Sequence, residues 1–209
     1  MSRITSLTKC RLCRAEGEKL FLKGARCFSG KCPIEKRGSV PPGMHGLKRK
    51  RPSDYGLQLR AKQKAKRIFA VNETQFRNYY LTAKKLKGLV GDNLIILLER
   101  RLDNVVFLSG LSLSKSHARQ LVSHKNVLVN QQKINIASYQ VQVGDKITIN
   151  PKLLEKFADS LKINQKDFQT PGWLKVDKAK LTVTVTALPD LQTSQTNIDT
   201  NLIIEYYSR

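Results

Sequence analysis

Residues 97–130 read LLERRLDNVVFLSGLSLSKSHARQLVSHKNVLVN, and the spacing of their apolar side chains changes within the stretch. Up to Val106 apolar residues recur every three or four positions, as on one face of a helix, and Gly110 is expected to end that helix. Ser114 is a suitable N-cap for a second helix. Past that helix the period becomes two, so Val127–Val129 is expected as a strand. Helices followed by short strands predict an α+β fold.

More short strands and one more helix are expected farther along the chain. Alternating residues predict strands at 140–143, 146–149 and 180–188, whereas the leucine spacing predicts a helix at 152–170. The run NLIIEYY at 201–207 is rich in β-branched and aromatic residues, so it is expected as a final strand.

On the N-terminal side, loop signals give way to helices. Residues 1–52 are rich in glycine and proline and lack a clear apolar period, so this segment is expected to need a metal or RNA to order it. Ser53 is expected to cap the first long helix, and Asn72 the next, which should stop near Gly88. The helix that ends at Gly110 is expected to begin at Asp92 or the following residue.

The charge of the chain indicates a polyanionic partner. It has 38 Lys and Arg against 16 Asp and Glu, a formal net charge of +22 and a pI near 10.1. Neutralising phosphates releases condensed counterions, and that release drives association with nucleic acid. No stretch approaches 18 apolar residues, which argues against a membrane span, and MSRITSLTKC lacks an apolar signal core, so a cytosolic location is expected.

The four cysteines lie close together in the sequence, at Cys10, Cys13, Cys27 and Cys32, with the spacing C-x2-C-x13-C-x4-C. Two such pairs across a short loop are typical of a structural zinc site, in which four thiolates leave no open coordination position. The alternatives are two disulfides, four free thiols or, less favoured, an iron–sulfur cluster.

Two basic segments are candidates for RNA contact. The first is the unbroken run Lys48, Arg49, Lys50 and Arg51, which could instead be a linker or a localisation signal. The second is the polar side of the helix that follows, which carries Arg60, Lys62, Lys64, Lys66 and Arg67. The four adjacent cations of the run Lys48–Arg51 repel one another unless a polyanion lies against them, and this favours RNA contact over a linker or a localisation signal.

No motif of an enzyme is present. The stretch GLSLSKS at 110–116 lacks the glycine that a phosphate-binding loop places before its lysine, and it joins two helices rather than a strand and a helix. The sequence contains no G-x-G-x-x-G, H-E-x-x-H or G-x-S-x-G. We therefore expect no catalytic residues and no small-molecule substrate.

Several motifs together resemble one known family. They are CRLCR, CFSGKC, PPGMHG, RPSDYGLQLRAKQKAKRIFAV, QFRNYY, LLERRLDNVVF, ARQLVSHKNVLVN, INIASYQVQVGD and IIEYYSR. Nearly end to end, the chain resembles a bacterial small-subunit ribosomal protein of the S-four family, in its zinc-bearing branch. The resemblance implies a zinc knuckle at 1–44, a helical body at 45–97 completed by strands within 171–209, and an S-four-type RNA-binding module at 98–160.

The resemblance also implies an RNA surface on that module. The residues that match it are Arg101, Ser114, Lys115, Arg119, Gln120, His124, Lys125, Asn130 and Lys133. Lys115 and Arg119 are four residues apart and should share one helix face. The sequence departs from the family after Asn130, where Gln131 and Gln132 replace the usual glycine, so a longer or differently shaped hairpin loop is expected.

By this resemblance, the chain is expected to be a structural constituent of the small ribosomal subunit. It would bind ribosomal RNA directly, nucleate assembly of the subunit body, contribute to translational accuracy, and lie beside neighbouring ribosomal proteins in the cytoplasm. The run Lys48–Arg51 would suit a contact with the path by which messenger RNA enters. The alternative is a zinc-containing helix-turn-helix DNA regulator, because a short turn joins the helices on either side of Gly110.

Overall fold

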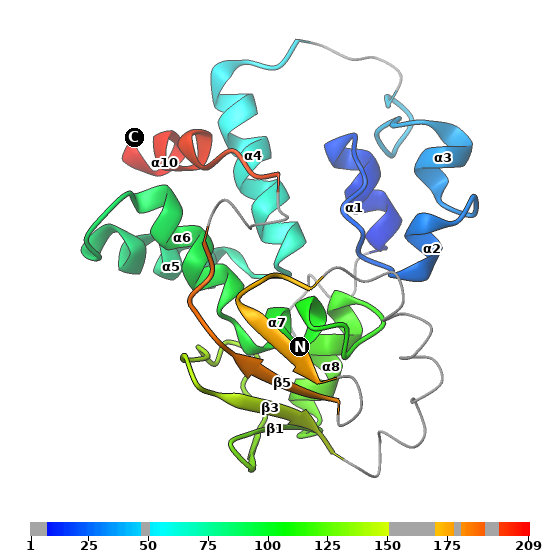
Figure 1. Ribbon diagram of the computed structural model, residues 1–209. Helices are drawn as coiled ribbons and strands as arrows, with labels where there is room; N and C mark the ends of the chain where they lie inside the picture. Colours follow the sequence, from blue (N-terminus) through cyan, green and yellow to red (C-terminus); the bar gives the residue numbers. More distant parts are fainter. Residues whose placement is uncertain (1–7, 47–50, 151–169, 178–180, 191–196) are drawn as a thin grey trace. The chain divides into compact units, whose positions relative to one another are not determined.

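The computed structural model describes residues 8–46, 51–150, 170–177, 181–190 and 197–209 (Figure 1). The chain divides into two compact units. The helical unit is formed by Met1–Leu94 with Thr196–Arg209, and the sheet unit by Ile95–Gln195. The runs Lys48–Lys50 and 152–169, where RNA contact and a helix are expected, lie outside the described residues.

The N-terminal segment of the helical unit contains short helices and buried leucines. It contains three short helices, α1 (Lys9–Glu16), α2 (Ala25–Phe28) and α3 (Pro33–Arg37). Leu12, Leu20 and Leu22 are each at most 8% exposed. The lack of an apolar period in the sequence did not predict these buried leucines. Glycine content concealed the helices because each is only one or two turns long and ends beside a glycine or serine.

Longer helices follow, and their starts agree with the sequence. In α4 (Asp54–Ile68) the Ser53 side chain accepts a hydrogen bond from the Gly56 N–H, at 3.2 Å. In α5 (Glu73–Lys85) the Asn72 side chain accepts one from the Gln75 N–H, at 2.8 Å. Both predicted caps are confirmed. The next helix, α6 (Val90–Glu99), begins slightly earlier than expected.

The expected final strand is instead a helix, α10 (Thr200–Ser208). The Asp199 carboxylate caps it by accepting hydrogen bonds from the Asn201 and Leu202 N–H groups. Ile203 is fully buried, and the ring of Tyr207 stacks on that of Tyr80 with centroids 4.7 Å apart. Strand propensity was misleading here because packing against α4 and α5 decides the conformation.

Gly91 in α6 lets α10 approach closely. A Cβ atom at this position would lie 2.7 Å from Thr200 Oγ1 and 2.8 Å from Thr200 Cβ, far inside van der Waals contact. The side chain of glycine is therefore the only one that fits without displacing the start of α10.

In the sheet unit, the expected continuous helix up to Gly110 is broken in two. α6 ends at Glu99, and α7 (Leu102–Leu108) begins after Arg101, whose backbone is extended. Arg101 forms an antiparallel bridge with Gln140, and the Leu102 N–H donates to the Tyr139 carbonyl at 2.9 Å. These partners lie almost forty residues away, so the local apolar pattern did not reveal the break. The following helix, α8 (Lys115–Ser123), has the predicted Ser114 cap.

The described strands form one antiparallel sheet in the order β2-β1-β3-β5-β4. Their bounds are β1 Val127–Val129, β2 Gln132–Ile134, β3 Lys146–Ile149, β4 Leu174–Asp177 and β5 Thr182–Val185. The expected strand at 140–143 is reduced to the bridge at Gln140, and β2 was not predicted. The strands after residue 170 were expected to complete the helical body, but they extend this sheet instead. β5 pairs with the edge of β3 that β1 leaves open, and β4 pairs with β5.

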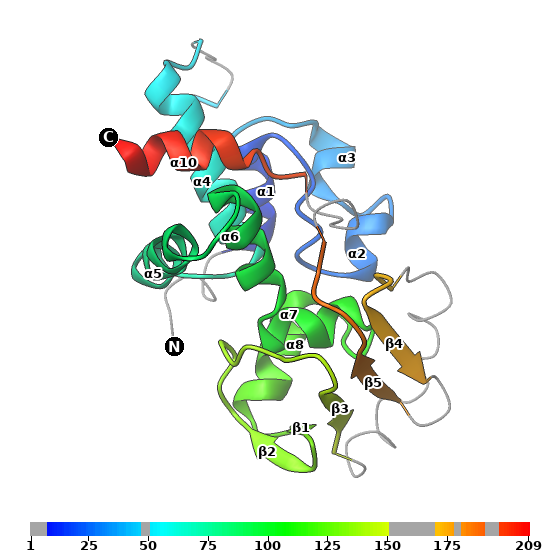
Figure 2. The ribbon, with the colours of Figure 1, turned by 60° about the vertical axis from the view of Figure 1, so that its left-hand side comes forward.

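The core of the sheet unit lies between α7, α8 and one face of the sheet, as Figures 1 and 2 show. Val105 and Val122 from the helices pack with Ile147 and Val183 from the strands, and all four are fully buried. The alternation along the strands leaves their other face to solvent. No helix among the described residues is long and apolar enough to cross a membrane.

Candidate nucleic-acid interface

The two cations whose spacing predicted a shared helix face lie half-buried on the side of α8 that contacts α7. Lys115 Nζ lies 5.3 Å from the centroid of the Phe107 ring, and Arg119 Nη1 lies 3.6 Å from Asp103 Oδ2. Burial lowers the pKa of Lys115 to about 8, although Asp103 and Glu99 favour its charged form. The Asp103 carboxylate therefore orients Arg119 while α7 partly shields Lys115.

Arg101, predicted as an RNA contact, is fully buried. Its Nε and Nη2 atoms donate to the two carboxylate oxygens of Asp103, at 3.0 and 2.8 Å. A fork of two charge-assisted hydrogen bonds fixes this carboxylate. The structure thus places Arg101 beneath the α8 surface, where it positions Asp103, and not on a face that a nucleic acid could touch.

The end of α8 and the β1–β2 hairpin carry the remaining predicted contacts. Gln120, His124, Lys125 and Lys133 have exposed side chains, whereas the Ser114 hydroxyl is occupied as the α8 cap by accepting from the His117 N–H. The helix ends in a left-handed turn at Lys125. These exposed groups lie within one stretch of the sheet unit that joins α8 to β2.

The hairpin loop is a tight two-residue turn, so the expectation of a longer loop was wrong. Val129 pairs with Gln132, which leaves only Asn130 and Gln131 between the strands, with φ values of 47° and 69°. The Asn130 side chain donates to Asp145 at 2.8 Å and accepts from the Lys146 N–H at 2.9 Å. These bonds hold the turn although glutamine is a poor residue for a positive φ.

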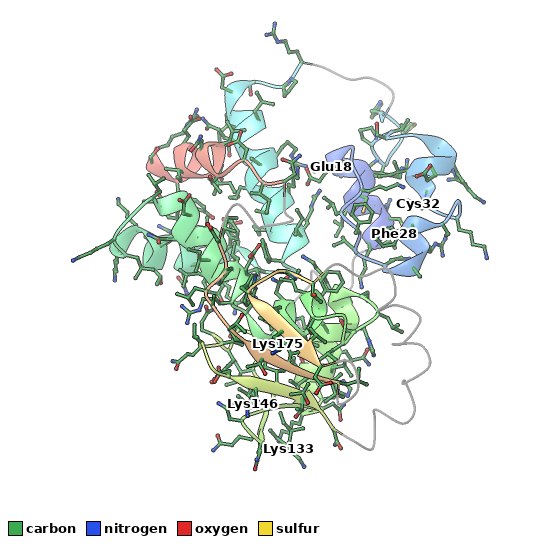
Figure 3. The ribbon with its side chains drawn as sticks, viewed as in Figure 1. Glu18, Phe28, Cys32, Lys133, Lys146 and Lys175 are labelled. Atoms are coloured by element: carbon green, nitrogen blue, oxygen red, sulfur yellow. The ribbon has the colours of Figure 1, made fainter. Side chains whose placement is uncertain are left out.

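The solvent face of the sheet adds Lys146 and Lys175, which sequence reasoning missed, to the predicted Lys133. Register places Lys146 beside Thr184 and Thr184 beside Lys175, and it places Lys133 in the same row as Thr148. Figure 3 shows Lys133, Lys146 and Lys175 on three different strands of the sheet. The alternation of Lys146 and Thr148 with buried isoleucines was the signal that could have found this face.

The cations of α4 are held by carboxylates of the same unit. Lys62 and Lys66 are 4% and 8% exposed, and their Nζ atoms lie 2.9 and 2.6 Å from the Glu73 carboxylate. Further ion pairs join Lys64 to Glu18 at 2.7 Å, Arg60 to Glu16 at 3.7 Å, and Arg67 to Glu16. The basic pattern of this helix therefore has an intramolecular role that the sequence did not reveal. Arg51, before the helix, is exposed.

The four cysteines line one small cavity of about 20 Å³ together with Leu22 and Ile34. All four are free thiols. Burial raises the pKa of the Cys13 thiol, against a hydrogen bond from the Leu20 backbone, and the Lys23 N–H lies 3.4 Å from Cys27 Sγ. Within the described ranges no three His, Cys, Asp or Glu side chains are arranged to hold a metal ion, so the expected closed zinc site is not reproduced.

Comparison with known proteins shows the family to which the chain belongs. Residues 6–99 match the ribosomal protein S4/S9 N-terminal domain, and residues 100–147 match the S4 domain. The chain is 50% identical over 202 residues to the small ribosomal subunit protein uS4 of Caldicellulosiruptor saccharolyticus, and 46% identical over 202 residues to that of Halothermothrix orenii. Each alignment covers 96% of both chains. The chain belongs to the uS4 family.

The uS4 assignment divides the candidate interface between two domains. The S4 domain match contains α7, α8 and the β1–β2 hairpin and ends within β3. The α8 surface therefore belongs to this domain. The cysteines and the α4 ion pairs belong to the N-terminal domain match. Strands β4 and β5 lie beyond both matches and widen the uS4 sheet.

Proposed function

We propose that the chain is a structural, ribosomal RNA-binding constituent of the small ribosomal subunit. The observation that carries this is the surface of α8, where Lys115 and Arg119 are held against α7 and exposed Gln120, His124 and Lys125 lie toward the end of the helix. Its uS4 relatives, which match almost the whole chain, are named as small ribosomal subunit proteins.

The chemistry of this surface suits folded RNA. Ammonium and guanidinium groups neutralise phosphates and fix the protein on the backbone, while amide and imidazole groups can bond to base edges or ribose hydroxyls. The rigid link from buried Arg101 through Asp103 to Arg119 supports a preformed site, which reduces the entropy lost on binding.

Within the subunit, the chain would bind ribosomal RNA early and nucleate assembly of the subunit body, beside neighbouring ribosomal proteins in the cytoplasm. It would thereby contribute to translational accuracy. The run Lys48–Arg51 would contact messenger RNA on its entry path. No catalytic activity is part of the proposal, because its residues bind and position RNA.

A titration tests the proposal. The purified chain is titrated with small-subunit ribosomal RNA and with unrelated RNA of equal length, at several salt concentrations and with duplex DNA as competitor. We expect binding to the ribosomal RNA that survives physiological salt while unrelated RNA is lost. Equal binding to both RNAs, vanishing together as salt rises, would overturn the proposal. Preference for duplex DNA would favour the helix-turn-helix alternative.

We also propose that Cys10, Cys13, Cys27 and Cys32 hold a structural zinc ion. The support is that the four residues line one cavity, whose volume of about 20 Å³ suits a single ion or water. When bound, zinc would link the loops around α1, α2 and α3 through four thiolates. Metal analysis should give one zinc per chain, and Cys27→Ser should lose it, whereas Ser29→Ala should keep it. Absorption in the visible region would instead indicate an iron–sulfur cluster.

A further inference from the structure

The surface of the N-terminal segment is hollowed into a groove of about 530 Å³ that lies between residues of α1 and α3. We call it the N-terminal basic groove. Among the residues that the structure describes, six cations line it, and no carboxylate, amide or aromatic side chain does. The cations are Arg11, Arg14, Arg26, Lys31, Lys36 and Arg37.

The charge of this groove is not balanced by acids of its own segment. Residues 8–46 contain three carboxylates, Glu16, Glu18 and Glu35. Glu16 pairs with Arg67 and Arg60, Glu18 with Lys64, and Glu35 with Lys19. Each carboxylate is therefore engaged with a cation outside the groove, which leaves the groove as a concentrated positive field.

One of the groove cations is fixed in place before any ligand arrives. The Arg14 Nε atom donates to the Val40 carbonyl at 2.8 Å, and its Nη2 donates to the Pro41 carbonyl at 3.4 Å. A guanidinium has five N–H donors, so further donors remain for an anion. Arg11 and Arg37, in contrast, are exposed and pair with no carboxylate among the described residues.

We propose that the N-terminal basic groove binds the sugar–phosphate backbone of RNA and contributes affinity without sequence preference. The proposal rests on the proposed ribosomal RNA-binding function and adds a second contact site, in the N-terminal domain. Guanidinium groups match phosphate oxygens in paired hydrogen bonds. The groove volume of about 530 Å³ lies within the range of ligand-binding clefts in proteins. Cations make up most of the described lining, and contacts from cations to phosphate oxygens carry no sequence information, so the backbone is the ligand that the groove fits.

The test compares two charge-matched double variants of the full chain. Arg11→Gln with Arg37→Gln removes two cations from the groove. Lys84→Gln with Lys85→Gln removes two exposed cations at the end of α5, outside it. Both are titrated with small-subunit ribosomal RNA and with unrelated RNA across a salt series, and circular dichroism melting checks folding. If the first variant melts early, Arg37→Gln alone takes its place.

We expect the groove variant to flatten the dependence of log K on log salt by up to about 1.4–1.8, two phosphates' worth, for both RNAs, and the α5 variant to leave it unchanged. Because contacts to the phosphate backbone carry no sequence information, the ratio of affinities for the two RNAs should stay as in the unaltered chain. An unaltered slope, an equal effect of the α5 variant, or a changed ratio would overturn the groove proposal. Failure of the proposed ribosomal RNA-binding function would give a different result from failure of the groove proposal. In that case the unaltered chain itself would bind both RNAs equally.

Discussion

The hydroxyl of Tyr207, in α10, donates a hydrogen bond of 2.9 Å to the carboxylate of Glu73, at the start of α5. The same carboxylate accepts from Lys62 and Lys66 of α4. Glu73 thus joins α5 to the preceding helix α4 and to the C-terminal helix α10, which is distant in sequence. Although burial raises its pKa, the hydrogen bonds from Lys66, Lys62 and Tyr207 outweigh it and lower the pKa of Glu73 to about 2.

Replacing Glu73 should change how stability depends on pH. A carboxyl whose folded pKa lies below its ordinary 4.5 stabilises the fold above that value, and the contribution disappears as pH falls toward 2. We expect Glu73→Gln to cost about 1 kcal/mol near pH 7, a discounted figure because the side chain is 46% exposed, and progressively less below pH 4.5. Urea unfolding at several pH values measures this. Tyr207→Phe removes only one of the three hydrogen bonds that lower this pKa, and it should give a smaller loss with the same dependence on pH.

A methyl group at Gly91 should weaken the attachment of α10. Gly91→Ala places Cβ against Thr200 and should cost about 1–3 kcal/mol by overpacking. Gly56→Ala in α4 is the matched control, since its Cβ would meet only ordinary contacts and alanine favours the helix. Thermal unfolding followed by circular dichroism compares them. Thr200→Gly should restore much of the loss in the Gly91→Ala background, and no restoration would contradict the proposed clash.

Replacing Gln131 with glycine should relieve the backbone strain in the β1–β2 hairpin turn. With φ of 69°, glutamine is strained there, and Gln131→Gly should stabilise the chain by about 0.5–1 kcal/mol after the added freedom of the unfolded chain is subtracted. Gln132→Gly, in β2, is the control and should destabilise, because the glycine then lies in a strand. Denaturant midpoints decide, and a loss of stability from Gln131→Gly would refute the strain argument.

The affinity for ribosomal RNA should fall as Lys115 loses its proton. Since burial lowers the pKa of Lys115 to about 8, the cation present at pH 7 is largely neutral at pH 9. We expect affinity to fall roughly two- to tenfold between these values, about one charge-assisted contact, and Lys115→Arg to remove most of that fall. Titrations at fixed salt measure it. Lys133→Arg should keep the fall, and a fall that persists in Lys115→Arg would exclude Lys115 as its source.

Local signals predicted much of the fold. The caps at Ser53, Asn72 and Ser114 were correct because a cap depends on its own side chain and a backbone N–H two or three residues on. Strands β1 and β3 were correct because one face of each is buried. The break at Arg101 and the helix α10 were missed because distant partners, Gln140 for the first and α4 for the second, determine them.

The candidate site was predictable only in part for the same reason. A basic helix in sequence does not reveal whether its cations face solvent or carboxylates, and Lys62 and Arg67 proved to be paired across the fold. Arg101 has the charge of a surface residue, yet it is buried against Asp103. By contrast, Lys115 and Arg119 share a surface as predicted, since helix geometry alone sets their spacing.

The helical unit is discontinuous, and this sets an order on its synthesis. Residues 95–195, including every described strand, leave the translating ribosome before Thr200–Ser208. The nascent sheet unit can therefore complete its strand pairing while Phe76 and Tyr80 still lack the ring of Tyr207 that covers them. During that interval the aromatic face of α5 is open to solvent and to other nascent chains. A released chain that ends at residue 195 should resist proteolysis in its strands and remain sensitive between residues 54 and 94.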